Sequence, residues 1–402
     1  MSILMAVMNY IFISPNFPKV YRHFVKELHL HGVNVLGIGD EPYEQLDPEL
    51  KDSLTEYCFV ADMNRVDWMI NTINYLKDKY GRIDFIESNN EYWLHNDATY
   101  REWFNVPNGF NVSELEDRQR KSGMKKYFKK AGAKVARYIL VSSLKNSEKF
   151  VKKVGFPVFA KPDLGVGAAK TFKIRNQKEL KAFHEQNLEE TYIMEEYLDG
   201  SIISFDGIAD ANSKVVMAFN EFFPTPIADV VSRKQDVYYY AKSVMPDSFY
   251  KLGEKIVKSF GLKQRCFHIE FFVLKKDKEG LGKKGDIVAL EANLRTPGGN
   301  TADLLNLTTN ISYYKTYADV IVGNKVETFY DSNRIAVSVD RRNEHHYEHS
   351  DEEIKDLYSR QLIERGTYPK VFAEAMGDVY YFAVFSNEKD MKKFVQFVMK
   401  KQ

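Results

Sequence analysis

Two stretches near the middle of the chain decide its fold: HIEFFVLK at residues 268–275 and DIVALEANLRTPGG at residues 286–299. Both are rich in apolar residues, and turn signals bound them, so they predict strands of an antiparallel sheet. Side chains alternate along a strand, so the pattern places Glu270, Glu291 and Asn293 on one face among apolar neighbours. Arg295, two residues beyond Asn293, points to the same face. A cross-strand polar ladder held by salt bridges is the alternative interpretation.

The polar residues of these strands have the donor chemistry of a magnesium site. Two carboxylates and an amide oxygen form a hard-oxygen set, and Mg²⁺ prefers few protein ligands together with water and nucleotide phosphates. Left unpaired in a buried position, the same groups would be costly. Arg295 could then bind a phosphoryl group during its transfer.

A Gly-rich loop upstream could bind phosphate. The run FPVFAKPDLGVGAAK at residues 156–170 ends an apolar strand in Lys161, and Gly165 and Gly167 let the backbone curl around an anion. The loop is not a P-loop, because Ala169 stands directly before Lys170, and it lacks the third Gly of a dinucleotide fingerprint. A Gly-rich surface hairpin with a solvent-facing lysine is the alternative.

Two further segments complete the candidate site. TYIMEEYLDG at residues 191–200 ends an apolar strand in acidic residues and could be an interdomain hinge whose backbone pairs with a flat base, while Glu195 or Glu196 takes ribose hydroxyls. An amphipathic edge strand explains it nearly as well. The basic helix around Lys121 to Lys130 has little aromatic interleaving, so one of its lysines reaching a phosphate is favoured over a nucleic-acid patch.

The rest of the chain indicates three parts. Residues 1–114 alternate strands and helices as a parallel βαβ sheet does, including strands at Tyr10 to Ser14 and from Val33 and a helix from Val66 to Tyr80. Residues 115–330 form a second, α+β domain, with a small lobe at about 130–200 and a large lobe at about 201–330. Residues 331–402 form a small appended αβ unit. The predicted fold class is therefore α/β plus α+β.

Composition excludes several function classes. The chain has 402 residues, and 57 Lys and Arg against 56 Asp and Glu give a net charge of +1, so no overall field draws it to nucleic acid or an anionic membrane. No stretch approaches the roughly 18 apolar residues of a membrane span. Cys58 and Cys266 stand far apart in apolar strands and are predicted to be core residues of a cytoplasmic protein.

The order and spacing of these motifs resemble the ATP-grasp superfamily, over roughly residues 8 to 330. The match is closest to carbamoyl-phosphate-synthase-like carboxylate-amine ligases, including the amino-acid ligases. The resemblance implies ATP and Mg²⁺, with Mn²⁺ as a substitute, and small-molecule carboxylate and amine substrates, amino acids among them. A homodimer is compatible with it. The site residues that it implies are Lys121 and Lys161 on the phosphates, the loop Gly165 to Lys170 over them, Glu195, Glu196, Tyr197 and Leu198 around adenine and ribose, Glu270, Glu291 and Asn293 on the metal, and Arg295 on the phosphoryl or carboxylate group.

The reaction implied is formation of an acyl phosphate from ATP and a carboxylate, followed by attack of an amine. The alternatives are a small-molecule kinase on the same scaffold and a regulatory subunit that binds ATP without turnover. The chain departs from the family pattern in two places. Ile202 and Ile203 follow the hinge Gly200 where many members carry a second Glu, which puts ribose recognition there in doubt, and the phosphate loop has fewer glycines.

Overall fold

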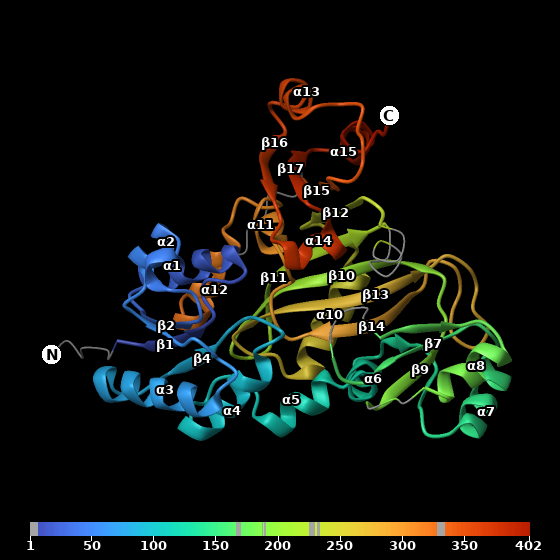
Figure 1. Ribbon diagram of the computed structural model, residues 1–402, viewed down its shortest axis with the longest axis horizontal. Helices are drawn as coiled ribbons and strands as arrows, with labels where there is room; N and C mark the ends of the chain where they lie inside the picture. The colour runs from blue at the N-terminus through green and yellow to red at the C-terminus, as the bar shows by residue number, and fades with distance from the viewer. Residues whose placement is uncertain are drawn as a thin grey trace.

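The computed structural model describes residues 7–165, 170–186, 188, 190–224, 230, 234–327 and 334–402. The N-terminal part is a parallel sheet of order β3-β2-β1-β4 (Figure 1). Its strands are β1 (Asn9–Ile13), β2 (Asn34–Gly39), β3 (Glu56–Phe59) and β4 (Phe85–Glu87), connected through α1 (Arg22–Leu30), α2 (Pro48–Ser53) and α3 (Val66–Tyr80). The predicted βαβ arrangement is confirmed.

The helices of this part form because their apolar residues recur at helical spacing. In α3, Met69, Ile73 and Leu76 are buried at positions i, i+4 and i+7, and the helix ends at Gly81, whose φ of +86° favours glycine. Three helices lead out of the domain: α4 (Leu94–Phe104), α5 (Val112–Gln119) and α6 (Lys121–Lys130). The predicted boundary at residue 114 falls inside α5.

The small lobe is an antiparallel sheet of order β6-β9-β7-β8. It comprises β6 (Tyr138–Leu140), β7 (Val158–Pro162), β8 (Phe172–Ile174) and β9 (Tyr192–Glu196), with α7 (Leu144–Val154) and α8 (Gln177–His184) against one face. Strands β7 and β8 pair antiparallel, so the Gly-rich segment connects two neighbouring strands.

The large sheet has nine strands among the described residues, in the order β16-β17-β15-β12-β11-β10-β13-β14-β5. From β5 (Lys134–Val135) it runs through β14 (Ile287–Asn293), β13 (Arg265–Leu274), β10 (Gly200–Ala209), β11 (Val215–Phe223) and β12 (Val237–Lys242) to β15 (Ile335–Arg341), β17 (Val379–Phe385) and β16 (Leu362–Thr367). The tail also contains α13 (Asp351–Leu357), α14 (Lys370–Met376) and α15 (Glu388–Val398). The strands of the tail therefore continue the sheet of the central domain across the expected boundary at 331.

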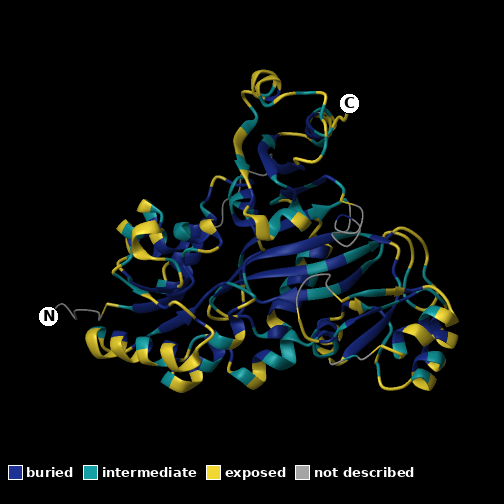
Figure 2. Cartoon of the chain, viewed as in Figure 1, coloured by how far each residue is buried: buried dark blue, intermediate teal, exposed yellow. Residues whose placement is uncertain are grey.

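The two faces of the large sheet have different roles. Phe267, Ile269 and Phe271 of β13 belong to a core shared with α10 (Asp247–Phe260) and α6. Cys266 of the same strand faces the other way, into a core with α11 (Thr301–Asn306), α12 (Tyr313–Val322) and the N-terminal sheet. His268 and Glu270 follow Cys266 on this second face, where the polar residues gather. The strands are largely buried, while the outer sides of α3 and α4 are exposed (Figure 2).

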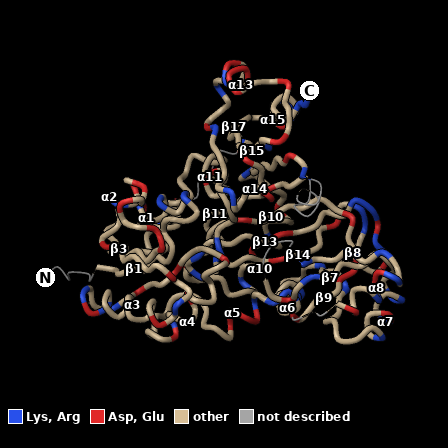
Figure 3. Tube along the Cα trace, in the orientation of Figure 1, with Lys and Arg blue, Asp and Glu red and all other residues tan. Residues whose placement is uncertain are grey.

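Charge and hydropathy agree with the composition. Lys and Arg are interspersed with Asp and Glu along the trace (Figure 3). Among the described residues no helix is both long and apolar enough to cross a membrane. Cys266 is buried and Cys58 is partly buried, and both thiols are free.

Candidate active site

The predicted metal ligands come together on neighbouring strands. Glu270 of β13 and Glu291 of β14 are direct partners in the antiparallel register, and Asn293 faces His268 one row further along. Glu270 and Glu291 are partly buried, with side chains 26% and 19% exposed. Burial opposes ionisation of Glu270, but the hydrogen bond and charge of His268 outweigh it and lower the pKa of this carboxyl. The result is an ionised Glu270 carboxylate directly beside Glu291 at one edge of the site.

Two of the predicted lysines also reach this region. Lys121, the first residue of α6, donates from Nζ to the Gly165 carbonyl at 2.6 Å and lies 3.6 Å from Glu291 Oε1. Lys161 of β7 lies 2.9 Å from Glu195 Oε2 and is 7% exposed. Burial lowers the pKa of Lys161, but Glu195 and Glu291 more than reverse this and raise it. Lys121 therefore lies beside the start of the Gly-rich loop and Glu291, and the neighbouring carboxylates hold Lys161 charged.

The loop itself is described only at its ends. Gly165 has φ +122°, a conformation that favours glycine, and Lys170 pairs with Glu190 at 2.6 Å. Gly167, predicted to cover the phosphates, lies outside the described residues.

The acidic hinge residues are engaged by basic side chains. Glu195 bridges Lys125 at 2.5 Å and Lys161, and although burial opposes its ionisation, these lysines lower its pKa to about 2. Glu196 receives two bonds from the Arg137 guanidinium, at 3.0 and 2.5 Å. Beyond them, Lys173 Nζ lies 3.8 Å above the Tyr197 ring, and Leu198 is buried. The carboxylates predicted to take ribose hydroxyls therefore have protein partners, and a role in nucleotide binding remains a prediction for this segment.

Arg295 is held from the N-terminal sheet. Its Nε lies 3.2 Å from Glu91 Oε2, and Gln119 donates to the other oxygen of Glu91 at 3.0 Å. Glu91 belongs to the segment Asn89 to Trp93, which follows β4. Asn89 has φ +56°, unusual for a residue other than glycine. The end of the first domain therefore meets the turn that follows β14.

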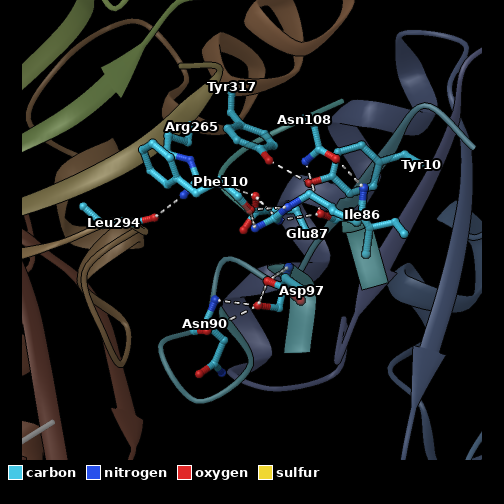
Figure 4. Close-up of polar contacts among 12 residues, drawn as sticks. Tyr10, Ile86, Glu87, Asn90, Asp97, Asn108, Phe110, Arg265, Leu294 and Tyr317 are labelled. Carbon is cyan, nitrogen blue, oxygen red and sulfur yellow. Dashed lines mark hydrogen bonds and ion pairs between the residues drawn. The ribbon is translucent and has the colours of Figure 1, made fainter. Parts of the chain in front are cut away.

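A buried charge network fixes this meeting (Figure 4). Arg265 of β13 lies 2.5 Å from Glu87 Oε2 of β4 and donates to the Leu294 carbonyl at 3.2 Å, one residue before Arg295. Arg101 of α4 lies 3.4 Å from the same Glu87 oxygen. Asp97 accepts from Ser88, and burial together with the charge of Glu87 raises the pKa of Asp97 to about 8. Through Arg265 the network ties the backbone just before Arg295 to Glu87 of the N-terminal sheet.

Sequence reasoning missed a cluster next to the carboxylate pair. Asp206 of β10 accepts at 2.5 Å from His268 Nδ1, and Ser204 bonds to Asp206 and, at 3.4 Å, to Glu221 of β11. Burial and the charge of Asp206 raise the pKa of Glu221 well above its ordinary value. Burial lowers the pKa of His268, but Asp206 and Glu270 raise it to about 10. Spacing by two in ISFD and HIE was the available signal, because it puts these side chains on one face.

Lys125 is a second residue of the site region that was not predicted from the sequence. It lies on α6 one turn after Lys121 and is 1% exposed. Within a run of lysines, only its helical spacing from Lys121 sets it apart from its solvent-facing neighbours.

The comparisons with known proteins agree with this geometry. Residues 154–301 match the ATP-grasp domain family, and no curated protein matches the sequence. The structure of an L-amino acid ligase from Bacillus licheniformis superposes with a TM-score of 0.71 at 14% identity, covering 98% of this chain and 97% of that one. An N5-carboxyaminoimidazole synthetase from Staphylococcus aureus gives 0.68 at 14% identity, covering 97% of each chain. The biotin carboxylase domain of a Hydrogenobacter thermophilus 2-oxoglutarate carboxylase gives 0.69 at 14% identity, covering 98% and 90%.

Proposed function

We propose that the chain is an ATP-dependent ligase of the ATP-grasp family that joins a small carboxylate to an amine, and the match of residues 154–301 to the ATP-grasp domain supports this. One observation carries the proposal: Glu270 and Glu291 stand side by side in register, with Asn293 next to them and Lys121 3.6 Å from Glu291. Binding of ATP alone does not require such a set of oxygen donors, whereas phosphoryl transfer does.

The donor set fits Mg²⁺. Glu270, Glu291 and Asn293 supply two carboxylates and one amide oxygen, and Mg²⁺ completes such a set with water and phosphate oxygens. The related biotin carboxylase domain carries MgADP, ADP and bicarbonate in its structure. We therefore assign these three residues to the metal, with Mn²⁺ as a substitute.

The remaining side chains have defined tasks in this proposal. Bound MgATP would supply the γ-phosphoryl group, which passes to the carboxylate to give an acyl phosphate and ADP. The amine then attacks the acyl carbon and loses a proton, the amide bond forms, and inorganic phosphate leaves. Lys121 and Lys161 neutralise phosphate oxygens, and Arg295 orients the carboxylate substrate. Glu91 keeps the Arg295 guanidinium in place at 3.2 Å.

The substrate class is the finer part of the proposal. The L-amino acid ligase superposes over nearly the full length of both chains, which supports amino acids as the first candidates. The ion pair of Arg295 with Glu91 also supports amino acids as substrates. It places a cation next to an anion, and an amino acid carries a carboxylate and an ammonium group that match these two charges.

The test screens the carboxylate without knowledge of the amine. The purified chain is incubated with MgATP, hydroxylamine and single amino acids or other small carboxylates, and ADP and hydroxamate are measured together; pairs of amino acids are then tested for peptide by mass spectrometry. Glu291→Gln serves as the control for contaminating ATPase. We expect hydroxamate in step with ADP for at least one carboxylate.

Two outcomes would contradict the proposal. ADP formed together with a phosphoester, and no hydroxamate, would identify a kinase. Nucleotide binding without any carboxylate-dependent ADP release above the Glu291→Gln background would favour the regulatory subunit.

A further inference from the structure

Three buried side chains on adjacent strands lie close enough to share one ion. Asp206 of β10, Glu221 of β11 and His268 of β13 each offer a ligand atom, and these atoms lie within 4.8 Å of one another. Asp206 and Glu221 are fully buried, and His268 is 7% exposed. The side chains share a sheet face because Ser204 pairs with Glu221 and Asp206 pairs with His268 in the register.

The cluster has one oxygen without a partner. Glu221 Oε1 is buried and has no hydrogen-bond partner among the described residues, while the other oxygen of Glu221 has only the 3.4 Å contact with Ser204. Burial first, and then the charges of Asp206 and Glu270, raise the pKa of Glu221, and His268 only partly offsets them. Such a carboxylate is costly in a protein interior unless a cation compensates it.

The imidazole is arranged as in metal sites. His268 Nδ1 faces Asp206 Oδ1 at 2.5 Å, and its other nitrogen, Nε2, contacts Glu270 Oε1 at 3.2 Å. A histidine that binds a metal through one nitrogen commonly donates the N–H of the other to a carboxylate, which fixes the tautomer and the ring orientation. Glu270 already supplies that carboxylate.

We propose that Asp206, Glu221 and His268 bind one Zn²⁺-class divalent cation, at a site separate from the Mg²⁺ ligands Glu270, Glu291 and Asn293. One imidazole nitrogen with two carboxylates favours Zn²⁺ or Mn²⁺ over the all-oxygen sites of Mg²⁺ and Ca²⁺. On binding, the ion displaces two protons, the one that His268 Nδ1 shares with Asp206 and the one on the Glu221 carboxyl, and both leave to solvent. Glu270 then connects the two sites, since it bonds His268 on one side and faces Glu291 on the other.

Metal binding by the nucleotide-free protein tests this inference. Chelator-treated full-length chain is dialysed against Zn²⁺, and in parallel Mn²⁺, and bound metal per chain is measured by mass spectrometry. We expect one ion per chain with a Kd of about 1 µM or tighter for Zn²⁺, weakened at least about tenfold in Glu221→Gln and in Asp206→Asn. Glu291→Gln is the matched control, because it removes a neighbouring carboxylate outside the cluster, and its Zn²⁺ binding should match the wild type.

The inference fails if the wild type binds neither Zn²⁺ nor Mn²⁺ at a metal concentration about 100 times the expected Kd. It also fails if folded Glu221→Gln and Asp206→Asn bind as the wild type does, since the ion then sits on other side chains. Circular dichroism establishes folding, and Glu221→Asp replaces Glu221→Gln if the latter is unfolded. No ATP is present, so this result does not depend on ligase activity.

Discussion

Replacing Glu195 with Gln should destabilise the protein strongly. Glu195 is 5% exposed, and its carboxylate lies 2.5 Å from the Lys125 ammonium and 2.9 Å from that of Lys161. Gln keeps the shape but leaves two buried ammonium groups next to a neutral amide. Removing one partner of a buried ion pair costs about 3 to 5 kcal/mol, so we expect a loss of about 3 kcal/mol or more.

Thermal unfolding followed by calorimetry measures this loss. For a domain of roughly 200 residues, 1 kcal/mol shifts Tm by about 2 to 4 °C, so the expected decrease is about 6 to 12 °C. Lys126→Met is the control on the same helix, because it removes an exposed pair with Asp117 worth less than about 1 kcal/mol. Adding Lys125→Met to Glu195→Gln removes one uncompensated charge and should recover part of the lost stability.

The reasoning is refuted if Glu195→Gln lowers Tm no more than Lys126→Met does. It is equally refuted if the double variant is less stable than Glu195→Gln alone, because the Lys125 charge would then not be the source of the cost.

Three more predictions concern the site and its support. Glu291→Gln and Glu270→Gln should each slow Mg²⁺-dependent ADP production about a hundredfold at saturating ATP without unfolding the chain. The double variant should be little slower than either single variant, since both residues serve one ion. Wild-type rates in both single variants would mean that the two carboxylates form only a structural ladder. Arg295→Lys should raise the KM for the carboxylate substrate about tenfold and change the KM for ATP less, because lysine cannot make a bidentate contact. Steady-state kinetics measures both constants, and a larger rise in the KM for ATP than in that for the carboxylate would contradict this. Asp97→Asn should gain stability relative to the wild type as the pH rises from 4 to 8. The folded pKa of Asp97 is about 8 and lies above the ordinary 3.8, so the stability that Asp97 contributes to the wild type is complete below pH 3.8 and falls by up to about 1.4 kcal/mol per pH unit above it. Unfolding free energies of the two proteins with equal pH slopes would contradict this.

Local patterns predicted the elements well. The helix expected from Val66 to Tyr80 has those same bounds, because its apolar spacing is regular and a glycine follows it. Glu270 and Glu291 were placed on one face correctly, since alternation along a strand needs no knowledge of distant partners.

Long-range register could not be predicted from one sequence. Asp206, Glu221 and His268 lie on three strands, and only the pairing of β10 with both β11 and β13 brings them together. A shift of one residue in either pairing would have moved them to opposite faces. The position of the tail in the large sheet could not be predicted for the same reason, because β15 pairs with β12, which lies almost a hundred residues earlier in the chain.

The continuity of the large sheet into the tail has a consequence for shortened forms of the protein. Strand β15 covers the whole length of β12, from Val237 to Lys242, a segment whose VYYYA run has high β-propensity. Shortening the gene before residue 335 would leave the backbone N–H and C=O groups of β12 open, and an exposed edge of this kind recruits strands from other chains. Expression trials of fragments ending near residue 330 should therefore yield aggregates, and soluble fragments need to retain the last three strands.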